Sequence, residues 1–227
     1  MSASALAFSP DGYAARTLSE IAAALPGATA VFRRRKLDFC CGGAVPLAAA
    51  AAARHVDLDE IEAELAELVA LGLAPDLPQD ALGLIALIET RYHAVHRRQL
   101  PELQRLAHRV EAVHAGRPDA PRGLAALLDR MGAELEEHMQ KEESILFPLI
   151  RNGGHPMISQ PIRVLLAEHD DHGAHLRALE ALTQDFVPPP DACSTWRALY
   201  AGAQKFSDDL MDHIHAENNV LFPQFLS

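Results

Sequence analysis

Apolar residues recur every three or four positions along most of the chain, which is the spacing of one face of an α-helix. Beyond residue 80 this pattern predicts four long helices, at about 80–114, 121–151, 158–185 and 192–225. Glycine- and proline-containing segments separate them, and no segment shows the alternation of a β-strand. The sequence therefore predicts an all-α protein whose larger part is an antiparallel four-helix bundle.

The first 75 residues carry shorter helical patterns, over about 18–25 and 28–36 and again after Asp57 or Asp59. The second pattern ends at residues 38–43, which read Asp-Phe-Cys-Cys-Gly-Gly. Residues 72–78 are rich in Gly and Pro, as in a linker. We therefore predict a small helical N-terminal domain over residues 1–75 and the bundle over residues 80–227.

The bundle region contains the same motifs twice. Residues 138–148 read H-x3-E-x2-I-L-F-P, and residues 213–223 read H-x3-E-x2-V-L-F-P. The preceding helices repeat H-x2-H, at residues 93–96 and 169–172. The bundle is therefore expected to be a duplicated helix pair. The repeated positions are enriched in residue types that bind metals, which a purely structural duplication has no reason to keep.

Residues four apart lie one above the other on a helix, so H-x3-E presents an imidazole and a carboxylate to the same point. A step of about 100° per residue places His138 and Glu142 at the centre of an apolar face that includes Ile145. His213 and Glu217 lie on the equivalent face of the fourth helix. One such pair alone is more often a simple hydrogen bond. Two buried pairs need compensation for their charge, and a divalent metal supplies it.

Each of the other two helices carries the repeated H-x2-H motif with its two histidines. The apolar pattern identifies the inward-facing one more clearly on the third helix than on the first. On the third helix the apolar stripe favours His169 over His172. On the first helix it points more toward His96 than His93, whereas alignment of the repeats pairs His93 with His169. Four His and two Glu suit two metal ions with bridging carboxylates better than one zinc, and the absence of thiolate favours iron or manganese.

Composition narrows the possible partners. The chain has 31 acidic and 20 basic residues and a net charge of -11, so no nucleic-acid partner is expected. The longest apolar run, residues 44–53, is about half a membrane span and contains Pro46, so no membrane association is expected either. The N-terminus lacks a signal-peptide pattern, and three Cys make no disulfide framework. A cytoplasmic location is therefore expected.

The bundle motifs resemble those of hemerythrin-like domains. Residues 37–43, Leu-Asp-Phe-Cys-Cys-Gly-Gly, resemble the short ScdA-type N-terminal domain of the repair-of-iron-centres (RIC) family. The similarity continues through residues 91–93 and 168–170 to residues 217–223, and so covers nearly the whole chain. It implies a homodimeric di-iron protein that helps to repair iron–sulfur clusters damaged by nitric oxide or oxidants. Its expected partners are damaged or apo iron–sulfur proteins, with nitric oxide or dioxygen as small ligands.

The same resemblance implies two non-haem iron ions per chain, bridged by both Glu and by an oxo or hydroxo group. The implied metal ligands are His93, His138, Glu142, His169, His213 and Glu217. Hemerythrins proper have a further His in place of one carboxylate, so an oxygen-carrier role is not expected. His215 departs from the family pattern, and its helical phase predicts a solvated side chain pointing away from the core.

Cys40 and Cys41 are the candidate catalytic residues. Neighbouring Cα atoms are about 3.8 Å apart, which is too close for an unstrained disulfide, so the pair is expected to be redox-labile. Residues 33–36 are all basic and are expected to lower the thiol pKa. The alternative, two small packing residues beside a Gly-Gly turn, stays open.

Three functions fit this pattern. The leading hypothesis is a stress-response repair factor that supplies iron or removes nitric oxide at damaged clusters. An enzyme that couples two nitric oxide molecules to nitrous oxide is the first alternative. A sensor or reservoir for nitric oxide or dioxygen is the second, and it is favoured least because the sequence shows no DNA-binding or signalling module.

Overall fold

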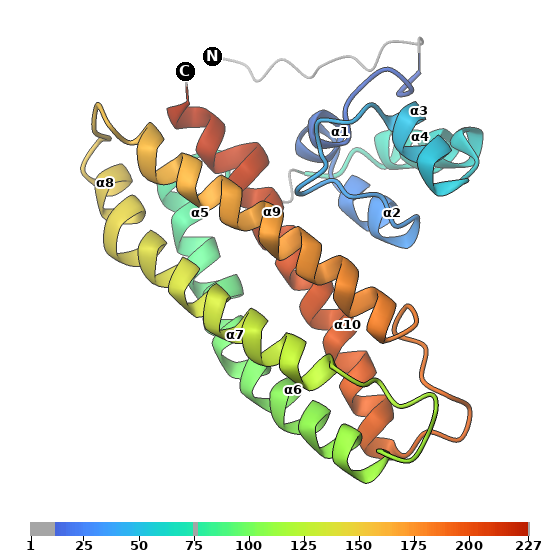
Figure 1. Cartoon of the computed structure of the whole chain (residues 1–227). Coiled ribbons are helices and arrows are strands. Elements are labelled where there is room, and N and C mark those ends of the chain that lie inside the picture. The colour runs from blue at the N-terminus through green and yellow to red at the C-terminus, as the bar shows by residue number, and fades with distance from the viewer. Residues whose placement is uncertain (1–11, 75–76, 227) are drawn as a thin grey trace.

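The computed structural model describes residues 12–74 and 77–226, and all regular elements within these ranges are helical. Four antiparallel rods form a bundle (Figure 1). The first rod consists of α5 (Ala81–Leu87), the π-helical turn η1 (Ile88–His93) and α6 (Ala94–Val113). The second consists of α7 (Leu124–Lys141), the π-helical turn η2 (Glu142–Leu146) and α8 (Phe147–Arg151). The predicted all-α bundle is confirmed.

The third rod is the single helix α9 (Ser159–Leu182). The fourth consists of α10 (Ser194–His215), the π-helical turn η3 (Ala216–Leu221) and the 3-10 turn η4 (Phe222–Phe225). A π-helical turn takes up more residues than an α-helical one, so residues near it face other directions than a 100° step predicts. Ile145, which was expected on the buried face, lies within η2 and is 51% exposed. That prediction was wrong for this reason.

The N-terminal part is a compact set of short helices beside α9 and η3 (Figure 1). They are α1 (Leu18–Ala24), α2 (Ala28–Arg34), α3 (Leu47–Arg54) and α4 (Leu58–Leu71). Thr17 and Glu20 form a reciprocal capping box at the start of α1, and the Asp57 side chain caps α4. Residues 1–11 and 75–76 lie outside the described ranges. The boundary between the domains, at residues 75–80, stays a prediction.

The N-terminal helices dock on the bundle. Their buried residues belong to the same apolar cluster as those of α6, α7 and α10. The Asn219 amide donates a hydrogen bond to the Phe39 carbonyl at 3.1 Å, and Arg33 forms an ion pair with Asp212. Apolar burial thus continues across the contact, which favours a fixed position of residues 38–43 against the bundle.

His215 lies in this contact, and the expectation of a solvated side chain was wrong. Its side chain is buried, with its ring edge-on to Phe39 at 5.5 Å. Asn219 donates a hydrogen bond to His215 Nδ1 at 2.8 Å. Burial, and secondarily the charge of Arg33, lower the pKa of His215 to about 4. The helical phase predicts only which side of the helix faces the bundle core. The opposite side, which carries His215, is covered by the N-terminal domain.

The buried apolar residues of the bundle form two clusters, and a layer of buried His and Glu lies between them. One cluster contains Leu100, Leu135 and Leu210, and the other contains Phe147 and Phe222. None of the helices in the described ranges is long and apolar enough to span a bilayer. The polar layer is the feature that needs a chemical explanation, since buried charge is costly without a partner.

Candidate metal centre

All four rods contribute to the polar layer, and its side chains form two groups. The 138/169 group consists of His138, Glu142, His169 and Glu217, and the 93/213 group consists of His93, Glu142, His213 and Glu217. Within each group the potential ligand atoms all lie within 4.8 Å of one another. Both Glu belong to both groups. The structure thus brings together all six side chains that the sequence singled out.

The ring nitrogens of the 138/169 group face one another in a way that calls for a cation. His138 Nδ1 donates to the Glu168 carboxylate at 2.8 Å, and His169 Nδ1 donates to Asn218 Oδ1 at 2.6 Å. In a neutral ring with its proton on Nδ1, Nε2 carries a lone pair. The Nε2 atoms of His138 and His169 are nevertheless only 3.0 Å apart. Two lone pairs repel at this distance, whereas a metal ion between them would bind both.

The 93/213 group repeats this arrangement with different surroundings. His93 Nδ1 donates to Glu143 at 2.7 Å, and its Nε2 lies 3.2 Å from His213 Nε2. Burial lowers the pKa of His93 to about 4, which keeps the ring in the neutral form that binds metals. The His213 ring stacks on Tyr92, with centroids 5.3 Å apart. This group, too, places its Nε2 atoms beside the shared carboxylates, with His93 Nε2 3.2 Å from Glu142 and His213 Nε2 3.1 Å from Glu217.

The two shared carboxylates are fully buried and incompletely satisfied. Both oxygens of Glu142 and Oε2 of Glu217 find no hydrogen-bond donor within the described residues. Burial, and then the charge of Glu217, raise the pKa of Glu142 well above its usual range. Burial acts in the same direction on Glu217, but the facing imidazoles of His213 and His169 outweigh it and lower its pKa. Orphaned oxygens beside imidazole lone pairs fit two cations with bridging carboxylates.

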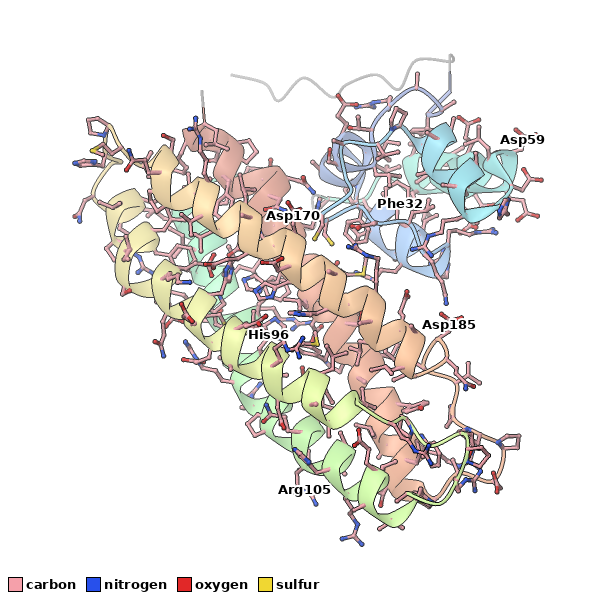
Figure 2. All side chains as sticks on the ribbon, viewed as in Figure 1. Phe32, Asp59, His96, Arg105, Asp170 and Asp185 are labelled. Carbon is pink, nitrogen blue, oxygen red and sulfur yellow. The ribbon has the colours of Figure 1, made fainter. Side chains whose placement is uncertain are left out.

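On the first rod, the structure places His93 in the metal groups and His96 outside them. His96 is buried inside the bundle (Figure 2), and neither of its ring nitrogens has a hydrogen-bond partner in the described part of the chain. Burial lowers the pKa of His96 to about 2. The apolar stripe pointed toward His96 because the extrapolation crossed the π-helical turn η1, which ends at His93.

Comparisons with known proteins give the same picture of both parts of the chain. The family described as the hemerythrin HHE cation binding domain matches residues 85–225, and ScdA_N, described as a domain of unknown function, matches residues 14–69. A probable iron-sulfur cluster repair protein of Haemophilus influenzae is 47% identical over 220 residues, which cover 95% of this chain and 98% of the relative. The chain belongs to the family of iron–sulfur cluster repair proteins.

A second relative supports this membership over the same length. It is the iron-sulfur cluster repair protein YtfE of Yersinia pseudotuberculosis, 48% identical over 219 residues, which cover 94% of this chain and 98% of the relative. This chain is thus a member of the repair family, and its hemerythrin-type bundle has two buried His/Glu groups that suit a di-metal site.

Cys40 and Cys41 of this repair-family chain lie against the 138/169 group. Both are free, with their Sγ atoms 3.6 Å apart, and Cys41 Sγ donates to the carbonyl of His169 at 3.2 Å. The Asn218 side chain provides a second link, because its amide donates to the Cys40 carbonyl at 3.0 Å while its oxygen accepts from His169 Nδ1. The Cys pair is thus connected to His169 of one metal group by two hydrogen-bonded links.

The basic residues before the Cys pair do not lower the pKa of Cys40. Arg33 and Lys36 form ion pairs with Asp212 and Asp185, while Arg34 and Arg35 pair with acidic residues of α4. The hydrogen bond with Cys41, burial and the nearby carboxylate of Asp38 raise the pKa of Cys40 well above its usual range. That prediction was wrong because the tertiary ion pairs direct these cations away from the thiol.

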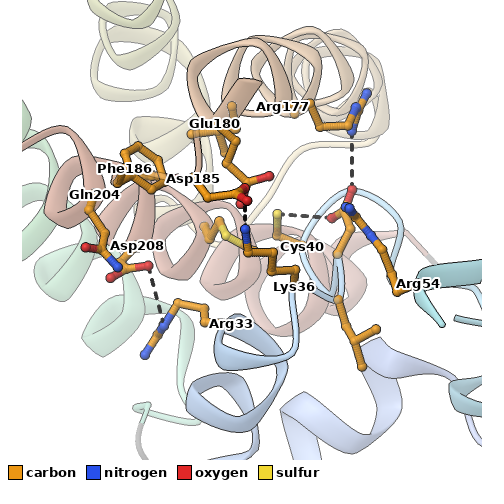
Figure 3. A pocket seen from close by; sticks show the side chains of 16 residues that line it. Arg33, Lys36, Cys40, Arg54, Arg177, Glu180, Asp185, Phe186, Gln204 and Asp208 are labelled. Atoms are coloured by element: carbon orange, nitrogen blue, oxygen red, sulfur yellow. Dashed lines mark hydrogen bonds and ion pairs between the residues drawn. The ribbon is translucent and has the colours of Figure 1, made fainter. Parts of the chain in front are cut away.

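A cavity of about 120 Å³ lies between the N-terminal domain and the bundle, with Cys40 in its wall (Figure 3). Ion pairs across the contact border it, between Lys36 and Asp185 and between Arg177 and Asp38. A small molecule can therefore approach Cys40 from this side.

Sequence analysis missed the residues that orient the ligands. Glu143, Glu168 and Asn218 accept hydrogen bonds from the Nδ1 atoms of three of the four metal-group histidines. One signal was available, because Glu143 and Asn218 occupy the same place in the two repeats, directly after the metal-group Glu. Such partners fix the tautomer and orientation of a metal-binding imidazole.

Proposed function

We propose that the chain holds two iron ions through His93, His138, Glu142, His169, His213 and Glu217, and that it supplies ferrous iron to iron–sulfur proteins with damaged or missing clusters. The observation that carries the proposal is the pair of facing Nε2 atoms in each group, with two buried carboxylates shared between the groups. Imidazole and carboxylate without thiolate suit iron. When bound, iron supplies the material for cluster assembly and the redox chemistry that nitric oxide or dioxygen engages.

The surrounding residues have distinct roles in this proposal. Glu142 and Glu217 would hold both ions, because each belongs to both groups, so both ions would depend on the same two side chains. Glu143, Glu168 and Asn218 keep the proton on Nδ1 of their histidines and leave Nε2 free to bind. The names of the relatives speak of iron–sulfur cluster repair, which supports apo or damaged iron–sulfur proteins as clients. Homodimer formation stays a prediction.

Cys40 and Cys41 are proposed to take part in iron transfer rather than to hold the di-iron centre. Two hydrogen bonds support this role: Cys41 Sγ donates to the His169 carbonyl, and the Cys40 carbonyl accepts from Asn218, which is also the partner of His169 Nδ1. The cavity with Cys40 in its wall supports it as well. Thiols bind ferrous iron readily once they lose their protons. In this proposal, an ion that leaves the 138/169 group binds these two sulfurs before it reaches the client protein.

The test is anaerobic transfer of iron to an apo ferredoxin in the presence of sulfide. The iron-loaded chain should restore the ferredoxin absorption in proportion to the iron that it loses. The double variant C40S/C41S should keep its two irons and restore clusters at least several-fold more slowly. His108→Gln is the matched control, because His108 forms an exposed pair with Asp129 away from both groups.

Three results would contradict the proposal or a part of it. Retention of both irons while clusters recover would show that the iron comes from elsewhere. Formation of nitrous oxide over many turnovers, with no loss of iron, would favour the nitric oxide reductase instead. Equal repair by C40S/C41S would return the thiols to a packing role.

A further inference from the structure

A third cluster of potential metal ligands lies one helical turn from the 138/169 group. His172 and His175 on α9 and Glu134 on α7 place one ligand atom each within 4.8 Å of one another. His175 Nδ1 and Glu134 Oε2 are 3.3 Å apart. None of these three residues belongs to the proposed di-iron centre.

His172 is the residue that needs an explanation. Its side chain is almost fully buried, at 3% exposure, and its Nε2 has no hydrogen-bond partner among the described residues. A buried, unpaired ring nitrogen costs free energy unless another group satisfies it.

We propose that Glu134, His172 and His175 form a third metal site, which binds one divalent first-row transition ion such as ferrous iron. Two imidazoles and one carboxylate with open positions are a donor set that such ions accept. The site spans the wall of the bundle, because the Glu134 side chain is 45% exposed whereas His172 is buried. The His172 ring is edge-on to His138, with centroids 5.1 Å apart.

The other half of the bundle shows what this cluster would look like without a site. The repeat places Asp209, His96 and Gln99 at the positions of Glu134, His172 and His175. Asp209 is engaged by both Arg91 and Lys205, and Gln99 offers a neutral amide in place of an imidazole. Of the three, only Asp209 and His96 are of residue types that commonly bind metals, and neither belongs to a metal group within the described part of the chain. The third site is therefore a property of one half only.

This position assigns the third site a role in loading or releasing the ion of the 138/169 group. The ion would enter from solvent at Glu134, bind His175 and His172, and pass on toward His138. This role rests on the proposed function, whereas the existence of the site does not. The two statements are tested separately below.

The site is tested on the full, iron-loaded chain by equilibrium dialysis against Co²⁺, with iron and cobalt counted by metal analysis. The parent protein should bind one cobalt per chain in addition to two irons. His175→Gln, which copies Gln99 of the other half, should bind at least tenfold less tightly. Glu134→Gln should weaken cobalt binding similarly, and the control His108→Gln should leave it unchanged. Absence of the additional cobalt, or its full retention in both variants, would overturn the site.

The loading role is tested by the rate at which the metal-free full chain takes up ferrous iron. His175→Gln should slow uptake about tenfold, the lower end of what outer ligands of metal sites contribute, and still reach two irons per chain. Unchanged uptake would overturn the role while the cobalt count still decides the site. If the parent chain does not retain two irons at all, the proposed function fails, and the cobalt difference between parent and His175→Gln still reports the third site.

Discussion

The two metal groups are equivalent but have different surroundings. The first half of the bundle is the part around the 93/213 group, and the second half is the part around the 138/169 group. His93 and His169 occupy the same place in the repeats, yet His93 Nδ1 donates to the Glu143 carboxylate while His169 Nδ1 donates to the Asn218 amide. Arg97 engages Glu143 from outside and closes the first half. Asn218 instead connects the second half to the Cys40 backbone. The metal-group residues are thus the same in both halves, whereas the residues that surround them differ.

One substitution between the repeats makes room for the thiols. The position of Arg97 in the first half corresponds to Gly173 in the second. A Cβ on Gly173 would lie 2.9 Å from Cys41 Sγ, which is closer than such atoms approach. A large side chain seals one half, and its absence lets the Cys pair reach the other. The comparison teaches that a duplicated metal centre can become one-sided through its outer residues alone.

The largest effect is expected from the residues that both halves share. Glu142→Leu combined with Glu217→Leu should reduce the iron content from two to near zero, because each Glu serves both groups. The metal-free double variant should unfold at or above the temperature of the metal-free parent, since replacing buried charge by apolar groups is often neutral or stabilising by about 1–4 kcal/mol. Metal analysis and thermal unfolding followed by circular dichroism measure both.

The control for this prediction is Glu102→Leu, which removes an exposed carboxylate that pairs with Arg105, three residues further along the same helix. It should keep two irons. Retention of two irons by the double variant would refute the assignment of the shared carboxylates and, with it, the equivalence of the two halves.

The orienting residues should separate the two metal groups. Glu168→Gln removes the carboxylate that accepts from His138, and Glu143→Gln removes the one that accepts from His93. Each should weaken one ion by about 10- to 100-fold, as outer-partner mutations do at other metal sites. Iron release to a chelator should then show one accelerated phase in each variant and two in the double variant. Acceleration of both phases by either single change would show that the groups do not act separately.

A smaller effect is expected where the thiols approach the second half. Gly173→Ala should push Cys41 away from α9, at an overpacking cost of about 1–3 kcal/mol, partly offset by the higher helix propensity of Ala. The thiols should react about tenfold faster with a thiol reagent, since 1.4 kcal/mol is a tenfold change in the open population. The iron content should stay at two.

Gly202→Ala is the matched control for the thiol prediction. Its added Cβ would meet only the end of the Leu103 side chain, at 2.8 Å, which can move. Thiol reactivity should stay at the parental rate. Equal acceleration in both variants would mean that general loosening, rather than the Cys41 contact, controls access.

The smallest effect concerns the equivalent inner histidines. His96→Leu should stabilise the metal-free protein by about 1 kcal/mol, because it removes a buried ring with no hydrogen-bond partner among the described residues. It should leave the iron count and the third site unchanged. His172→Leu should abolish the third ion instead. Urea unfolding and cobalt binding measure the two, and loss of iron from His96→Leu would show that His96 contributes to the 93/213 group.

Some of this protein follows from local pattern. Apolar periodicity predicted the four rods, because a helix needs only its own hydrogen bonds and one apolar face. The repeated H-x3-E predicted two His/Glu pairs in the core, since residues four apart meet on any helix. Both inferences use interactions that span a single turn, which the sequence contains in full.

Other features depend on contacts between distant segments and were decided only by the tertiary structure. The π-helical turns change the phase that sequence periodicity assumes. They displaced Ile145 from the buried face, and they placed His93 in a metal group although apolar periodicity alone pointed to His96. Docking of the N-terminal domain buried His215. It also paired Arg33 with Asp212 and Lys36 with Asp185, so that these cations do not lower the pKa of Cys40. Burial and pKa depend on every neighbour in space, and those neighbours come from segments more than 100 residues apart along the chain.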